Sequence, residues 1–173
     1  TLYGVTKTSM DVGYSSILSE ADPYSEEVER ATEDFPATPS VLFAFQTKPD
    51  VFQRRALEAM DALNQRFNEV EGAIAMGSLM NSRLNDVQAE IYNRDYLIPE
   101  LEELTDEDIE IIRRLALDDD DLVKSILSPD GDMALASVKF SPLTDDQAGR
   151  LSVARSVITL RDSLREEYPD IEI

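Results

Sequence analysis

The sequence contains no cysteine, no histidine and no tryptophan among its 173 residues. Without cysteine there is no disulfide framework and no thiolate metal site. Without histidine the chain lacks the commonest metal ligand and general base. Since aromatic residues make up only 7% of the chain, a core must be built mainly from Leu, Ile, Val, Ala and Met. The compartment stays open, because a protein outside the cytoplasm can do without disulfides.

Long apolar runs and phosphate-binding loops are also missing. The longest uncharged stretches, such as residues 35–47, fall well short of the roughly 20 apolar residues that a membrane-spanning helix needs. Neither GxxxxGK[ST] nor GxGxxG occurs in the sequence. Because Thr1 is not a natural start, we expect the chain to be a piece of a longer polypeptide.

Basic residues are scarce, since 16 Lys and Arg stand against 36 Asp and Glu, a formal net charge of −20. Such a surface repels phosphate, so nucleic acid is not expected as a partner. The acids are dispersed along the chain, which favours adaptation to concentrated salt over an ordinary acidic protein, because a Debye length of about 3 Å at roughly 1 M salt screens the self-repulsion. We therefore expect the fold to be lost as salt falls, which circular dichroism in dilute buffer and in molar KCl would test.

Four segments have the patterns of β-strands. Residues 40–47 form a near-continuous run of apolar β-forming residues between two prolines, which predicts a central strand buried on both faces or nearly so. Ile74 and Met76 fall on one face of a second predicted strand. The remaining strands are predicted over residues 133–140 and at the C-terminal "DIEI".

Two amphipathic helices alternate with these strands. The first, over residues 51–67, has its apolar residues on one stripe and follows Asp50, a predicted N-cap. The second is predicted to be capped by Thr144 and to run to about Glu167. Its predicted apolar stripe consists of Ala148, Leu151, Ala154, Val157 or Ile158, and Leu164.

Between these two halves lies a predicted helical insertion at about residues 81–128. Thr105 and Asp108 have capping-box spacing at the start of one helix. The acidic run of residues 118–121 is expected to interrupt that helix, and Asp130-Gly131 has the strongest hairpin-type turn signal in the chain. The element order therefore predicts an α+β fold, namely a ferredoxin-like split β-α-β…β-α-β antiparallel sheet with two helices on one face.

No group of residues has the pattern of a catalytic, cofactor-binding or metal site. The acids of residues 118–121, with Asp130 and Asp132, are consecutive or badly spaced for a calcium loop, which needs alternate acids and a closing Glu. Adjacent carboxylates are expected by chance among 36 acids, and no serine has a histidine or a Ser-x-x-Lys partner to activate it. We therefore expect no enzymatic activity, no cofactor and no metal.

Met76, Leu79 and Met80 lie beside the predicted insertion. Methionines near core positions most often fill gaps in packing. If the domain contacts a hydrophobic ligand, however, these three residues are the substrate contacts that we expect.

Nearly the whole chain carries a family resemblance. The order "T…MD…YSSILSEADP…EEVERATEDFP…SVLFAF" resembles the start of the first extracytoplasmic loop of the resistance–nodulation–division (RND) superfamily, in its MMPL and sterol-sensing-domain-like exporter branch. Residues 105–140 are similar to that family's helix, turn and porter strand, and residues 145–173 to the helix and strand before the next membrane segment. The matching lead-in positions are Asp11, Leu18, Asp22-Pro23, Glu29 and Phe35.

The resemblance implies the porter-type ectodomain of a proton- or ion-driven exporter of hydrophobic or amphiphilic compounds in the cell membrane. Residues 1–39 would be an extended lead-in with a short acidic helix on the membrane side, and residues 40–173 a porter-like domain on the extracytoplasmic side. The implied partners are the membrane helices and second ectodomain loop of the same chain; a homo-oligomer is left open. The family's proton-relay acids lie in membrane helices, so none carries over.

Two alternatives to the exporter stay open. One is a stand-alone ferredoxin-like module that senses a small ligand at a dimer interface. The other is an interaction domain that binds no small ligand.

Overall fold

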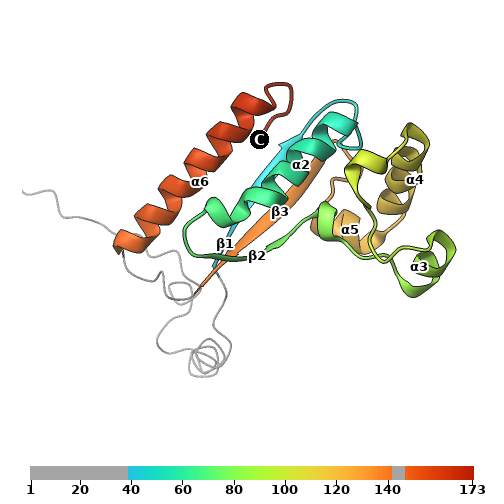
Figure 1. Ribbon diagram of the computed structural model, residues 1–173, viewed down its shortest axis with the longest axis horizontal. Helices are drawn as coiled ribbons and strands as arrows, with labels where there is room; N and C mark the ends of the chain where they lie inside the picture. Colours follow the sequence, from blue (N-terminus) through green and yellow to red (C-terminus); the bar gives the residue numbers. More distant parts are fainter. Residues whose placement is uncertain (1–38, 142–146) are drawn as a thin grey trace, which may run out of the picture. The chain divides into compact units, whose positions relative to one another are not determined.

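The computed structural model describes residues 39–141 and 147–173 (Figure 1). The chain divides into two units, residues 1–37 and 38–173, and all of the described residues belong to the second. The predicted lead-in with its acidic helix, the lead-in positions of the family resemblance and the predicted cap Thr144 lie outside the described residues.

Three strands form an antiparallel sheet in the order β1-β3-β2 (Figure 1). They are β1 (Ser40–Gln46), β2 (Ala73–Gly77) and β3 (Met133–Phe140). β3 pairs with β1 along its length, from Ser40↔Lys139 to Gln46↔Met133. On its other side β1 forms one antiparallel bridge, between Gln46 and Glu172. The predicted C-terminal strand is therefore reduced to that bridge in this structure.

Two helices, α2 (Arg54–Arg66) and α6 (Gln147–Glu167), lie side by side (Figure 1). The Arg66 guanidinium on α2 donates to Ser163 Oγ on α6 at 3.0 Å. Their buried side chains form one core with a single face of the sheet. This core includes Phe43, Phe45, Leu57, Leu63, Ala136, Val138, Leu160 and Leu164.

The start of α2 differs from the prediction. Its N-cap is Gln53 rather than Asp50, and no side chain caps it. Asp50 instead accepts a hydrogen bond from the main-chain N–H of Phe52 at 3.0 Å. Asp50 therefore folds the loop before the helix, because a short side-chain carboxylate can satisfy the main chain two residues on.

The predicted stripe of α6 is also wrong in part. The side chains that pack against the core are Val153, Val157, Leu160 and Leu164. Leu151, expected to be inward, is 53% exposed, and Ile158, the alternative to Val157, is 47% exposed. Ala154, also expected to be inward, is exposed as well. The apolar surface of this helix is wider than the stripe that the sheet covers, so periodicity alone could not locate the contact line.

In β2 a register shift between Ala73 and Ala75 breaks the regular alternation. Ala73 and Met76 pair with Phe140 and Val138 on the covered side, while Ile74 is 58% exposed. The prediction that Ile74 and Met76 share one face is therefore wrong, because an extra residue in one strand shifts the side chains that follow it.

Three short helices lie between β2 and β3, where the insertion is predicted. They are α3 (Asp86–Tyr92), α4 (Asp106–Leu117) and α5 (Asp120–Ser125). The capping box at Thr105 and Asp108 is confirmed, since each residue's side chain accepts from the other's main-chain N–H, at 3.0 and 3.2 Å. The acidic run does interrupt the helix, because Asp119 caps α5 by accepting from the N–H groups of Asp121 and Leu122.

The described residues leave the second face of the sheet open. In β1 the buried residues are Phe43 and Phe45, whereas Leu42 is 61% exposed, so the prediction of a strand buried on both faces is wrong. By alternation and register, this open face comprises Ser40, Leu42, Ala44, Gln46, Ala75, Gly77, Met133, Leu135, Ser137 and Lys139. The described residues thus form an α+β domain with a three-stranded antiparallel sheet and five α-helices, of which α2 and α6 lie along the covered face of that sheet.

Candidate functional site

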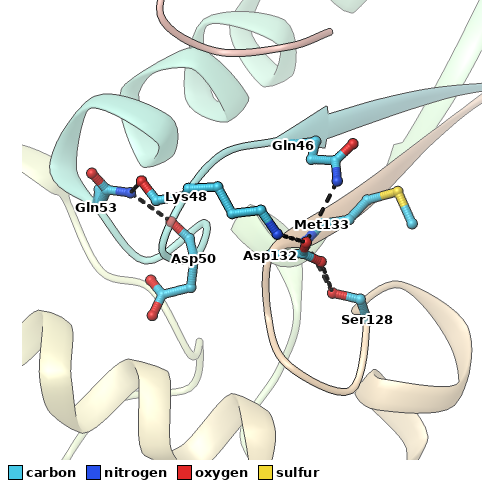
Figure 2. A network of polar contacts seen from close by, with 7 residues as sticks. All are labelled: Gln46, Lys48, Asp50, Gln53, Ser128, Asp132 and Met133. Carbon is cyan, nitrogen blue, oxygen red and sulfur yellow. Dashed lines mark hydrogen bonds and ion pairs between the residues drawn. The ribbon is translucent and has the colours of Figure 1, made fainter.

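A network of polar contacts joins the loop after β1 to the turn before β3 (Figure 2). Asp132 is its centre: one carboxylate oxygen accepts from Lys48 Nζ at 2.6 Å and the other from Ser128 Oγ at 2.9 Å. Main-chain bonds run alongside, from Thr47 N to Asp132 O at 3.1 Å and from Val51 N to Gly131 O at 2.8 Å. We call this network the clamp, because it ties two segments that are more than 80 residues apart in the sequence.

The clamp also reaches the helical insertion. Arg113 on α4 donates to Asp50 Oδ2 at 2.8 Å, and Gln53 Nε2 donates to the main-chain oxygens of Lys48 and Asp50, both at 2.9 Å. These hydrogen bonds therefore connect one end of the sheet to the start of α2 and to helix α4.

The electrostatics of the clamp are those of a structural ion pair. The hydrogen bond from Lys48, followed by the one from Ser128, lowers the pKa of Asp132 to about 2. The same bond to Asp132 raises the pKa of Lys48. Asp132 is therefore ionised at any ordinary pH and both of its oxygens are occupied, so it is poorly suited to proton transfer.

Three of the six acids considered for calcium have separate structural roles. Asp119 caps α5, Asp132 lies in the clamp, and Asp120 pairs with Lys124 at 2.7 Å. Within residues 39–141 and 147–173, no group of three acids is placed to hold a metal ion.

A cleft of about 570 Å³ lies between α2, the short 3₁₀ turn Leu79–Asn81 and the loop that follows α3. Its polar lining includes the amides of Asn64, Gln65 and Asn81. Arg94 is the one cation among the described lining residues. The acids of the lining are Asp61, Asp95, Glu100 and Glu102. Such a lining suits a polar ligand better than a purely hydrophobic one.

The three predicted substrate contacts lie in different environments. Met80 lines the cleft, Met76 is half-buried against the core, and Leu79 is fully buried with 0% exposure. Asn81 Nδ2 donates to the Met76 main-chain oxygen at 3.0 Å and so links the turn to β2. Contact of these residues with a substrate stays a prediction.

The open face of the sheet is the feature that sequence reasoning missed. None of the three strands contains an Asp or a Glu, and Lys139 is their one charged residue. The exposed apolar side chains include Leu42 and, at the β2 bulge, Ile74. The sequence does contain a signal, since a strand with no acid is unexpected in so acidic a chain, but hydropathy alone does not distinguish a strand buried on both faces from one that exposes a face.

Comparison with known proteins adds no relative. No family model matches the chain, and neither a curated protein nor a solved structure is similar enough to count as a match. Among the described residues, no helix has both the length and the apolar character that crossing a bilayer requires.

Proposed function

We propose that this chain is the porter-type extracytoplasmic domain of an RND-type membrane exporter of hydrophobic or amphiphilic compounds, and that it is not an enzyme. In this role the domain moves as a rigid body against a pseudo-symmetric partner loop and passes that motion to the membrane helices. The partners are the membrane helices and the second ectodomain loop of the same polypeptide.

The observation that carries this proposal is the contrast between the acid-free open face and the rest of the chain. Acids make up 36 of 173 residues, yet the strands that build this face have none. Charged residues are depleted where protein surfaces pack on one another, and exposed apolar patches mark such contacts. A sheet with helices on one face and a second face without acids suits a domain that works by packing against a neighbour.

The strand order supports the finer fold proposal, a ferredoxin-like split β-α-β…β-α-β arrangement. α2 connects β1 to β2 with β3 between them, and α6 leads from β3 to Glu172, which bridges to the far side of β1. Extending that bridge into a strand would make a four-stranded sheet with each β-α-β unit split by a strand of the other.

The first test is the coding sequence on both sides of the chain. Apolar spans of about 20 residues directly before Thr1 and soon after Ile173 are expected; polar flanks on both sides would end the proposal.

The second test is transport by the complete protein. Leu42→Glu and Ile74→Glu are expected to abolish efflux of an amphiphilic dye while the membrane content of the protein is unchanged, because they place a charge in the packed contact. Glu110→Gln, on the exposed side of α4, is the matched control and should leave efflux unaltered. Full efflux by the Leu42 and Ile74 variants would contradict a packing role for the open face.

The cleft beside Met80 favours one alternative, a module that senses a small ligand. Its volume lies in the range of small-molecule pockets, roughly 300–1,000 Å³. On that hypothesis the chain alone dimerises and binds a defined solute with measurable heat in calorimetry. A chain that stays monomeric and releases no heat with any solute would remove the alternative.

A further inference from the structure

Hydrogen bonds anchor the lining of the cleft beside Met80 to the rest of the domain. Asn81, in the lining, donates through Nδ2 to the main-chain oxygen of Met76 on β2 at 3.0 Å. The main-chain oxygen of Leu101, also in the lining, accepts from Arg54 Nη1 on α2 at 3.0 Å. Because these bonds tie the lining to a strand and a helix, the cleft is formed before any ligand binds, which lowers the cost of binding.

The lining of this cleft has an excess of negative charge. It contains four carboxylates, those of Asp61, Asp95, Glu100 and Glu102, and one guanidinium, that of Arg94, a formal charge of −3. A concave surface lined by one sign of charge focuses the field and concentrates ions of the opposite sign. The cleft therefore favours a cationic ligand.

Three of the four carboxylates are not used by the fold. Asp61 accepts from Gln65 Nε2 at 2.5 Å. For Asp95, Glu100 and Glu102, by contrast, no side-chain hydrogen bond or ion pair is formed within residues 39–141 and 147–173. These three side chains are thus available to accept hydrogen bonds from a ligand.

The acids of the cleft are too dispersed for a compact ion. No group of three acids among the described residues is placed to hold a metal ion, so a single point charge cannot engage Asp95, Glu100 and Glu102 together. A ligand with positive charges spaced along a chain can reach several of them. Ammonium groups suit this task, because each brings several N–H donors to an acceptor-only carboxylate, and such charge-assisted hydrogen bonds are strong.

The remainder of the lining suits the methylene chain that joins such ammonium groups. Its apolar members are Met80, Ile98, Pro99 and Leu101. Tyr96 adds an aromatic ring that is 43% exposed and already attracts a cation, since the Arg83 guanidinium lies 5.4 Å from its centre. Methylenes next to a charged nitrogen pack on apolar surface in the same way as the stem of a lysine side chain.

We propose that this cleft is a binding site for a linear polyamine, whose ammonium groups contact Asp95, Glu100 and Glu102 and whose methylene chain packs on the apolar lining. An anion would meet the excess of carboxylates, and an uncharged apolar ligand would remove their water without replacing its hydrogen bonds. The inference goes beyond the proposed function and does not rest on it, because it uses the described residues alone.

Calorimetry of the 173-residue chain with spermidine, a linear polyamine, tests the proposal. Molar KCl is the solvent, because it screens attraction beyond about 3 Å and leaves direct contacts to decide the affinity. Spermidine is expected to bind at a single saturable site. Butylamine, with one ammonium group, should bind at least about tenfold more weakly, and uncharged butanediol should give no heat. Equal affinity for butylamine and spermidine would overturn the polyamine class.

Two adjacent acids provide a matched pair of variants. Glu102 and Glu103 belong to one short turn and are both exposed, but Glu102 lines the cleft and Glu103 is not among its described lining residues. Glu102→Gln is expected to weaken spermidine binding about tenfold, because it removes a charged acceptor without changing the shape of the side chain. Glu103→Gln removes the same charge from the chain and should leave the affinity unchanged. Equal weakening by both would indicate diffuse attraction to an acidic surface and would overturn the site.

Nuclear magnetic resonance locates the bound polyamine independently. The side-chain amide signals of Asn64 and Asn81, both in the lining, are expected to shift with spermidine, and that of Gln88 on α3 is not. Equal shifts of all three would contradict a site in the cleft. A chain that is folded by circular dichroism and gives no heat with spermidine would refute the site and leave the exporter proposal as it stands.

Discussion

The two faces of the sheet are built from the same short strands and have opposite environments. On the covered face, Phe45 and Val138 are fully buried at 0% exposure under α2 and α6. On the open face, Leu42 is 61% exposed although it lies between two residues whose exposure is low, Val41 and Phe43. Both faces therefore carry large apolar side chains, and only those of the covered face are buried by helices.

In an acidic protein, the absence of acids from a strand can therefore have two explanations. One face is buried by helices within the domain, and the other is free of acids although no helix of residues 39–141 and 147–173 covers it. Since surface acids keep such a chain soluble, their absence from the open face fits a surface reserved for a neighbour.

The largest expected difference between the two faces comes from truncating one large side chain on each. Phe45→Ala should destabilise the chain by about 3–5 kcal/mol, because it leaves a cavity in the core. Leu42→Ala should change the free energy of unfolding by no more than about 0.5 kcal/mol. Urea unfolding in molar KCl measures both. A large loss for Leu42→Ala would mean that the isolated chain already covers its open face.

A pair of glycines gives a smaller contrast. Gly131 has φ +71° and an added Cβ would lie 3.2 Å from Leu117 Cδ2, whereas a Cβ at Gly77 on the open face meets nothing within 4 Å. Gly131→Ala should therefore cost about 1–2 kcal/mol, and Gly77→Ala should lie within about 0.5 kcal/mol of the parent. Thermal unfolding of the two variants checks the difference, and a stabilising Gly131→Ala would contradict the described turn.

The smallest expected effect is a change in how the Tm declines at low pH. The folded pKa of Asp132 is about 2, below its ordinary value of 3.8. A lowered folded pKa contributes stability that is fully present above about pH 4 and is lost as pH falls through about 2. Asp132→Asn should lower the Tm at neutral pH and flatten its decline between about pH 4 and 2.

The matched control for the clamp is Lys139→Gln, which removes the one charge of the open face. Lys139 is exposed, so both the Tm and its decline in acid should match those of the parent. A parent chain whose Tm falls no more steeply than that of Asp132→Asn over this range would show that the Lys48–Asp132 pair adds nothing to stability.

Much of the local structure could be predicted from the sequence. The capping box at Thr105 and Asp108, the break in the helix near Asp119 and the strand over residues 133–140 depend on neighbours within a few positions, and all three are confirmed. The predictions that failed depend on distant partners. The bulge at Ile74 depends on its pairing with β3, and the inward stripe of α6 depends on where the sheet lies.

The candidate site was less predictable than the fold. Met80 does line a cleft, yet Leu79, one residue earlier, belongs entirely to the core. Lys48 and Asp132 gave no signal, because residues 84 positions apart meet only when the loop after β1 and the turn before β3 come to the same end of the sheet.

The sequence by itself determined the positions of most helices and strands, the turn at Gly131, the excess of acids and their exclusion from all three strands. These properties are written in residue types and in spacings of a few positions, which helix and strand geometry converts directly into local structure. Only the tertiary structure decided which face of the sheet is covered, which side of α6 faces inward and which charges form the clamp. Those outcomes depend on contacts between segments far apart in the chain, whose pairing no local pattern specifies.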